Sequence, residues 1–219
     1  MFIQPAALSV SRLKRRKSHF KNKWVYFCDA DERVTAELAE KMLSVVADNT
    51  EYAAFRVQRR DYFMGRWLRH VTPSPFNIRL FKIGAVKFER ITNPYTNVSG
   101  SVGDLKEHFD HYPFSKGISH WVNKHNWYSS LEAAEINLNA EFLRDWNFKD
   151  VFFNPDANIR RKAQKNFYYS LPFRPLLMFF GLYFLKMGFL DGYPGFIFSV
   201  LRAFYELIIV LKNNELQVK

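Results

Sequence analysis

The segment that most constrains the fold is Trp24–Cys28, a short apolar run followed at once by four residues of which three are acidic. Short, nearly continuous apolar runs are typical of strands that are buried on both faces of a parallel sheet. In open α/β sheets, ligands bind beyond the carboxyl ends of such strands. The run therefore predicts an α/β fold, with Asp29, Asp31 and Glu32 at the edge where chemistry is expected.

The residues after the acidic cluster predict a helix and then a strand. Thr35 can cap a helix whose apolar face would consist of Leu38, Met42, Val45 and Val46. Alternation of apolar and polar residues over 52–59 predicts a half-exposed strand, with Ala53, Phe55 and Val57 on one side.

Three further segments complete this reading of the middle of the chain. Alternation over 78–82 predicts a second strand with Ile78 and Leu80 on the same face. The Asn, Pro, Ser and Gly content of 92–103 predicts a loop. Helical spacing resumes over 118–134.

Two carboxylates, Asp29 and Asp31, stand two residues apart, which places them on the same side of an extended strand end. Mg²⁺ and Mn²⁺ prefer such oxygen ligands and complete their shell with water and substrate phosphates. Two aspartates after a strand can also serve only to cap the following helix. The spacing lacks the Gly and the closing Glu of an EF-hand, which excludes that calcium site.

The charge balance is strongly basic, with 32 Lys and Arg against 21 Asp and Glu. Residues 1–23 form a basic segment, which fits either a solvated tail or a contact with a membrane surface or a phosphate. The apolar start precedes its basic residues, the reverse of a secretory signal, and predicts a cytoplasmic protein. The single cysteine, Cys28, excludes an internal disulfide.

A second basic segment, residues 59–70, interleaves arginines with aromatic rings. Its arginines are Arg59, Arg60, Arg66 and Arg69. Guanidinium groups match phosphate or an acidic acceptor, and the rings could stack on sugars. The same pattern suits single-stranded nucleic acid or a basic face that merely meets solvent.

The segment 171–211 is dominated by apolar and aromatic residues. Charges interrupt it, so no uncharged stretch reaches the roughly 18–20 residues of a spanning helix. Gly192–Gly195 predicts a turn. A pair of helices lying in a membrane interface fits this pattern, and a helical hairpin packed on the domain or in a dimer is the alternative.

An ordered set of motifs resembles bacterial family 2 glycosyltransferases of the branch that builds surface polysaccharide or lipopolysaccharide. Residues 24–38 read W-V-Y-F-C-D-A-D-E-R-V-T-A-E-L, like the metal-binding segment of that family. The other matching segments follow in the same order: 59–70, 79–81, 102–105, 111–117, 124–129, 132–133, 171–175 and 188–192. The resemblance covers roughly residues 20–212.

The resemblance implies roles for several residues. Asp29 and Asp31 would hold Mg²⁺ or Mn²⁺ and the diphosphate of a nucleotide-sugar donor. His111 would be a third metal ligand or a diphosphate contact, or else a buried core histidine. The candidate bases for the acceptor hydroxyl are Asp104, Glu107 and Glu89, and the candidate phosphate or acceptor contacts are Arg66, Arg69, Lys124 and His125.

The resemblance also implies a GT-A fold whose nucleotide-binding βαβ units precede the acidic segment. Each unit needs roughly 30 residues, and 28 residues stand before Asp29. We therefore expect a partial GT-A sheet that lacks its first βαβ units, with a basic segment at 1–23, a catalytic and acceptor-side region at 24–165 and membrane-associated helices at 166–219.

The expected protein is a metal-dependent glycosyltransferase at the inner face of the cell membrane. Its acceptor would be lipid-linked or a polysaccharide, and nucleic acid is not an expected partner. The alternatives are a non-catalytic remnant that keeps the acceptor and membrane surfaces, and a basic nucleic-acid-binding module.

Overall fold

The computed structural model describes residues 23–48, 50–89, 95–138, 146–171 and 173–218. The chain divides into two compact units. The sheet unit comprises residues up to Trp67 together with Pro73–Ser115, and the helical unit comprises Leu68–Thr72 and Lys116–Lys219. The basic segment predicted at 1–23 lies almost wholly outside the described residues.

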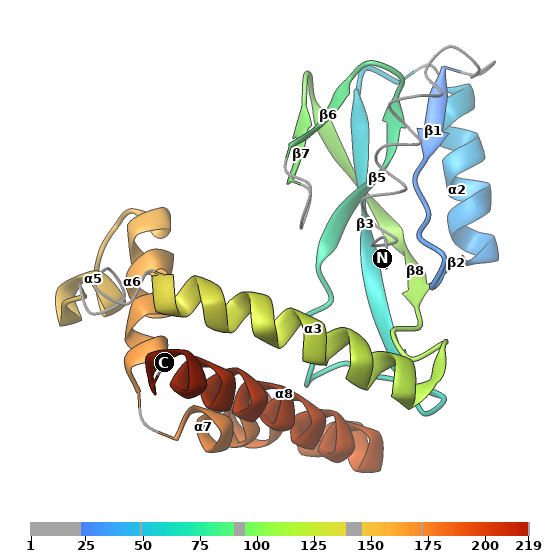
Figure 1. Cartoon of the computed structure of the whole chain (residues 1–219). Coiled ribbons are helices and arrows are strands. Elements are labelled where there is room, and N and C mark those ends of the chain that lie inside the picture. Colours follow the sequence, from blue (N-terminus) through green and yellow to red (C-terminus); the bar gives the residue numbers. More distant parts are fainter. Residues whose placement is uncertain (1–22, 49, 90–94, 139–145, 172, 219) are drawn as a thin grey trace. The chain divides into compact units, whose positions relative to one another are not determined.

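The sheet unit is built on a mixed six-stranded sheet in the order β1-β5-β3-β8-β2, with β4 paired to β3 (Figure 1). Within this sheet only β3 and β8 run parallel, and the other pairs are antiparallel. The strands are β1 (Trp24–Tyr26), β2 (Glu32–Val34), β3 (Ala54–Phe63), β4 (Arg66–Trp67), β5 (Phe76–Lys82) and β8 (Val102–His111).

The strand before the acidic cluster differs from the expectation. The sequence predicts a buried parallel strand over Trp24–Cys28, but β1 ends at Tyr26, is half-buried and pairs antiparallel with β5 at one end of the strand order. Its apolar residues are covered on both sides nonetheless. Trp24 and Tyr26 pack on one core cluster, and Val25 on another.

Two core clusters lie on opposite faces of the sheet. The larger one contains Leu38 of α2 (Ala36–Ala47), together with Phe55, Val57, Leu80, Leu105 and Phe109. The predicted helix after Thr35 is confirmed: the Thr35 hydroxyl accepts a hydrogen bond from the Leu38 N–H at 3.2 Å. Met42 and Val45 face the core as expected, whereas Val46 is exposed.

The smaller cluster contains Ala54, Phe81 and Val86. It lies beneath a two-stranded hairpin made of β6 (Val86–Glu89) and β7 (Tyr95–Val98). The loop predicted over 92–103 is therefore wrong at β7 and at the start of β8, while residues 90–94 lie outside the described part. Because this hairpin covers the second face, Ala54 is buried as fully as Phe55.

A β-bulge in β5 overturns one side-chain prediction. Phe55 lies opposite Leu80 and Arg56 opposite Ile78, so Arg79 is an extra residue in β5. A bulge shifts the alternation of side chains by one. Ile78 consequently packs on the smaller cluster and Leu80 belongs to the larger one, rather than both sharing a face.

The helical unit pairs two long helices, α3 (Gly117–Leu138) and α8 (Gly192–Val218), side by side (Figure 1). The helix predicted over 118–134 is confirmed within α3. The other elements are α5 (Phe148–Phe152), α6 (Ala157–Ser170), α7 (Arg174–Phe180), the π-helix η2 (Gly181–Leu185) and the 3₁₀-helix η3 (Gly188–Asp191).

The turn predicted at Gly192–Gly195 lies elsewhere. The chain reverses between η2 and η3, where Met187 takes a left-handed conformation, and Gly192 at φ 68° begins α8. The segment Gly188–Val218 is long and apolar enough to cross a membrane. The sequence argument missed this because it required an uncharged stretch, whereas a long helix can carry isolated charges and still have a high mean hydropathy.

Candidate functional site in the sheet unit

A tight turn between β1 and β2 carries the two aspartates singled out in the sequence. The Glu32 N–H donates to the Asp29 carbonyl at 3.1 Å, which closes the turn. In return the Glu32 carboxylate accepts from the Asp29 N–H at 3.1 Å. The Asp31 carbonyl accepts from the Tyr112 N–H at 2.7 Å, just beyond β8. The turn is thus fixed on both sides by backbone groups.

Arg79, the extra residue at the bulge in β5, connects the turn to the sheet through its side chain. Its guanidinium donates to Asp29 Oδ2 at 3.2 Å and to Glu32 Oε1. It also lies over the rings of Phe27 and Phe109, with centroids 5.3 and 5.1 Å away. Burial raises the pKa of Glu32, and the charge of Arg79 opposes this shift. Glu32 and Arg79 therefore form a buried ion pair beneath the turn.

His111, at the end of β8, lies between two carboxylates. Its Nδ1 is 2.5 Å from Asp61 Oδ1, and its Nε2 is 3.5 Å from Asp31 Oδ2. Arg59 holds the other Asp61 oxygen at 3.1 Å. Burial alone would lower the pKa of His111, but the two carboxylates outweigh it and raise the pKa to about 9. The ring is therefore an imidazolium at neutral pH.

This charge arrangement predicts a pH-dependent stability. Because the pKa of His111 is raised above the usual value of about 6.5, its contribution is fully present below pH 6.5 and is lost as pH rises through 9. We expect the free energy of unfolding to fall by on the order of 3 kcal/mol across this window. Urea unfolding at several pH values measures it.

The matched comparison uses two histidine variants. In His111→Gln the loss of stability between pH 6.5 and 9 should largely disappear. His120→Gln, at an exposed position on α3, should keep the wild-type pH profile. Equal profiles for both variants would contradict the assignment of His111 as the titrating group.

The chemistry of this turn suits a divalent cation that shares its shell with a ligand. The side chains of Asp29 and Asp31 are 36% and 32% exposed, so both carboxylates meet solvent. Among the described residues, no group of three or more His, Cys, Asp or Glu side chains is arranged as a metal site. In this arrangement both ring nitrogens of His111 face carboxylates. This geometry suits a histidine that forms ion pairs rather than one that coordinates a metal.

The basic-aromatic segment forms the end of β3 and a hairpin. Met64 and Gly65 both have positive φ, as a two-residue hairpin loop requires. Arg60 stacks over Trp67 at 4.1 Å, and Tyr62 stacks on Tyr112 at 5.3 Å. The structure divides the four arginines: Arg59, Arg60 and Arg66 belong to the sheet unit, and Arg69 belongs to the helical unit.

The three candidate bases are not gathered at the turn. Asp104 forms a bidentate ion pair with Arg56, at 2.6 and 2.8 Å, and this hydrogen bonding lowers the pKa of Asp104. It lies seven residues along β8 from His111, roughly 20 Å in an extended strand. Glu107 lies where β8 bulges against β3, and one of its carboxylate oxygens is buried without a hydrogen-bond partner among the described residues. Glu89 ends β6, and its side chain lies outside the described part.

Lys124 and His125 lie on α3 in the helical unit. The His125 ring stacks on Trp121 at 3.7 Å, donates from Nδ1 to the Trp121 carbonyl at 2.8 Å, and meets the Tyr205 ring edge-on. Burial lowers the pKa of His125 to about 4, so it is neutral and packed between helices. The Lys124 ammonium lies 5.8 Å from the centroid of the Tyr128 ring.

Sequence reasoning missed the group that organises the helical unit, Asp191. Its buried carboxylate accepts from the N–H groups of Arg69, His70 and Val71 at 2.9–3.1 Å, and from His70 Nδ1 at 2.8 Å. Three successive backbone donors lower the pKa of Asp191 against the effect of its burial. The signal available in the sequence was an acid inside an apolar segment, which is rarely tolerated without partners.

Other functional residues missed by the sequence reasoning lie around the acidic turn. Arg79 and Asp61 had no assigned role, and Glu32 was only part of an acidic cluster. An arginine in the apolar 78–82 strand was the one available signal for this group. Asp61 carried none, because its partner His111 is 50 residues away.

No family model matches the chain, but the known proteins that are similar to it include two bacterial glycosyltransferases. The chain is similar to an uncharacterized glycosyltransferase of Rickettsia typhi, with 25% identity over 211 residues that cover 90% of this chain and 64% of that protein. It is also similar to the lipopolysaccharide core biosynthesis glycosyltransferase LpsC of Rhizobium meliloti, with 26% identity over 199 residues, 86% of this chain and 63% of that protein.

The chain therefore spans less than two thirds of the length of these curated relatives. Both of these relatives carry the name glycosyltransferase. The α/β architecture, with its mixed sheet and apolar C-terminal helix, is consistent with a glycosyltransferase-like fold.

Proposed function

We propose that this chain is part of a metal-dependent, family 2, GT-A glycosyltransferase that acts at the cytoplasmic surface of the cell membrane in lipopolysaccharide or polysaccharide synthesis. The observation that carries the proposal is the turn at Asp29–Glu32. It presents two solvent-facing carboxylates on a backbone held rigid by Glu32 and Arg79. The names of the two relatives agree with this chemistry.

In this proposal Asp29 and Asp31 hold Mg²⁺ or Mn²⁺ against the diphosphate of a nucleotide sugar. The bound cation would neutralise the charge that develops on the departing diphosphate. His111 and Arg79 pair with the two carboxylates, which remain partly exposed to solvent. A hydroxyl of a lipid-linked or polysaccharide molecule would be the acceptor. Glu107 and Glu89 remain as candidate bases, because Asp104 forms an ion pair with Arg56.

The proposal predicts that metal and nucleotide bind together. Because two carboxylates leave most of the metal shell to other ligands, we expect weak Mn²⁺ binding by the chain alone and clearly tighter binding with UDP present. The double variant Asp29→Asn/Asp31→Asn should remove the UDP-dependent heat. Isothermal titration calorimetry of Mn²⁺, with and without UDP, measures both.

The control is Asp48→Asn, an exposed acid at the end of α2, which should titrate like the wild-type chain. Identical heats in the wild type and the double variant would remove the metal site from the proposal.

A further inference from the structure

One face of the helical hairpin formed by α7, η2, η3 and α8 carries large apolar side chains that the described residues leave exposed. We call this the outer face. Its members, each at least 39% exposed, are Leu176, Leu177, Phe180, Phe184, Leu185, Met187, Phe189, Leu190, Tyr193, Phe196, Val200, Phe204, Leu207 and Leu211. Monomeric soluble proteins rarely expose apolar patches of this size.

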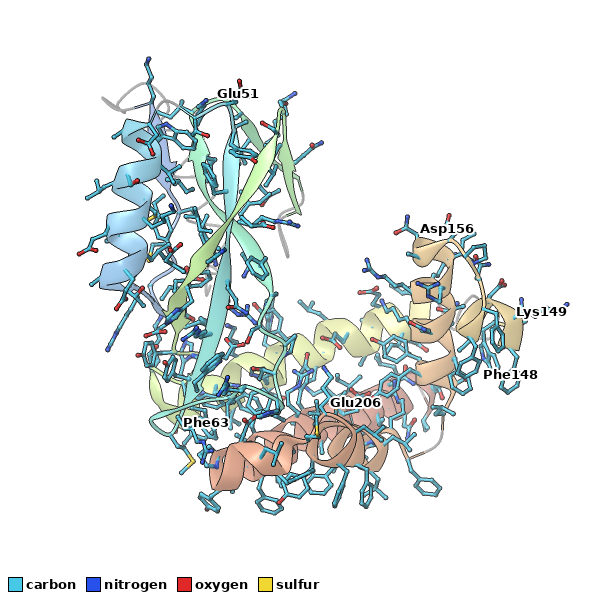
Figure 2. The ribbon with its side chains drawn as sticks, turned by 180° about the vertical axis from the view of Figure 1, so that it is seen from behind. Glu51, Phe63, Phe148, Lys149, Asp156 and Glu206 are labelled. Atoms are coloured by element: carbon cyan, nitrogen blue, oxygen red, sulfur yellow. The ribbon has the colours of Figure 1, made fainter. Side chains whose placement is uncertain are left out.

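Three of the charged residues of the same hairpin are buried, whereas Lys186 at its turn and Glu215 near its end are exposed. Arg174, Asp191 and Glu206 are each no more than 5% exposed (Figure 2 labels Glu206). Arg174 lies 3.4 Å from Glu206, and Asp191 is held by backbone donors. A hairpin made for water would place charges outside and apolar groups inside. Here three charges are buried while the outer face exposes apolar groups, which indicates that an apolar medium surrounds this face.

The long helix gives the same indication on independent grounds. The segment Gly188–Val218 contains an 18-residue window with a mean hydropathy of 1.7, of which only 28% is buried. A core helix of a soluble protein can be equally apolar, but it would be mostly buried. Most of this window has no protein covering it within the described residues.

The inward side of α8 argues against a helix that spans the bilayer. The Lys212 ammonium donates to Asn126, Ser129 and Ser130 of α3 at 2.5–2.9 Å. Tyr205 donates to Glu132 of α3 at 2.7 Å. A helix held along one side by a polar helix cannot be surrounded by acyl chains, so only its outer face is available to lipid.

The unit also presents cations suited to lipid head groups. Exposed basic residues lie on α5, on α6 and at the hairpin turn: Lys149, Arg161, Lys162, Lys165 and Lys186. Figure 2 labels Lys149 and Phe148 on α5, and both side chains are exposed. Exposed cations with neighbouring apolar groups are typical of segments that lie on anionic membranes.

We propose that the outer face of α7, η2, η3 and α8 inserts into one leaflet of an anionic bilayer, as a monotopic hairpin whose buried charges pair inside the protein. This inference deepens the membrane part of the proposed function. It does not depend on sugar transfer, because every residue that carries it lies in the helical unit.

The test is cosedimentation of the full chain with vesicles of phosphatidylethanolamine and phosphatidylglycerol. We expect binding that survives 1 M salt, since burial of apolar groups is not screened. Leu185→Glu and Leu211→Glu should each lower the bound fraction by about tenfold or more. The matched control, Leu43→Glu on an exposed position of α2, should bind like the wild type.

The orientation is tested with sealed vesicles and a membrane-impermeant maleimide added outside. In a Cys28→Ser background, Lys186→Cys and Glu215→Cys place reporters near the two ends of the hairpin's long helix. Full labelling of both is expected. Protection of one reporter would show a spanning helix and overturn the monotopic arrangement.

Two other results would overturn the inference. A chain that stays in the supernatant with vesicles has no lipid-binding face. A soluble dimer by light scattering that Leu211→Glu converts to a monomer would show that a second copy covers the outer face. The nucleotide-dependent Mn²⁺ titration is independent of all these outcomes, so the two proposals can fail separately.

Discussion

Replacing Asp191 with alanine should lower the free energy of unfolding of the helical unit by about 3–5 kcal/mol. The substitution leaves the N–H groups of Arg69, His70 and Val71 without their acceptor inside the protein. Space around Asp191 is tight, because a Cβ atom at Gly195 would collide with the Asp191 Cβ as well as with the Gly188 carbonyl. Chemical denaturation followed by circular dichroism measures the loss.

Two comparisons make this prediction specific. Asp191→Asn keeps one acceptor oxygen and should lower the free energy of unfolding less than Asp191→Ala does. Asp156→Ala removes an exposed acid that caps the first N–H groups of α6, and should cost only about 1 kcal/mol. An Asp191→Ala protein as stable as Asp156→Ala would show that the backbone donors find other partners.

The second large effect is expected at Glu32. Glu32→Ala removes the acceptor of the Asp29 N–H and leaves Arg79 buried with only Asp29 as a charged partner. Loss of one member of a buried ion pair typically costs about 3–5 kcal/mol, and we expect about 3 kcal/mol because Asp29 remains. The turn should also lose its fixed geometry, so UDP-dependent Mn²⁺ binding should weaken by about 10–100-fold.

Glu40→Ala, an exposed acid on α2, provides the control and should change neither stability nor the titration. Glu32→Gln preserves the shape and one acceptor, and should fall between the two. If Glu32→Ala weakens Mn²⁺ binding without loss of stability, Glu32 contacts the ligand directly. If neither property changes, the ion pair beneath the turn contributes neither to stability nor to Mn²⁺ binding.

The parts of this structure that follow from local chemistry could be predicted from the sequence. The cap at Thr35, the face of α2 at Leu38 and Met42, and the long helix after Gly117 all depend on neighbours within a few residues. The acidic cluster after a strand could also be predicted, because a short apolar run before carboxylates is a local pattern.

The features that differ depend on partners far along the chain. Antiparallel pairing of β1 is decided by β5, 54–58 residues later in the register, and no pattern within Trp24–Cys28 encodes it. The bulge at Arg79 inserts one extra residue into β5. Ile78 and Leu80 therefore face opposite sides of the sheet, whereas alternation alone predicts the same side. β7 was not predicted, because its sequence Tyr-Thr-Asn-Val is short and polar.

The position of β2 at the end of the strand order has a consequence for the order of folding. Its partner β8 lies far along the chain, with Glu32 opposite His111, and β8 itself must first pair with β3 across an intervening segment whose described residues hold four other strands. Contacts of long sequence separation form late, because loop closure must precede them. The turn that bears Asp29 and Asp31 therefore acquires its geometry only when the sheet is nearly complete, so a nascent chain cannot present the two carboxylates in order before residues 102–111 have left the ribosome and docked.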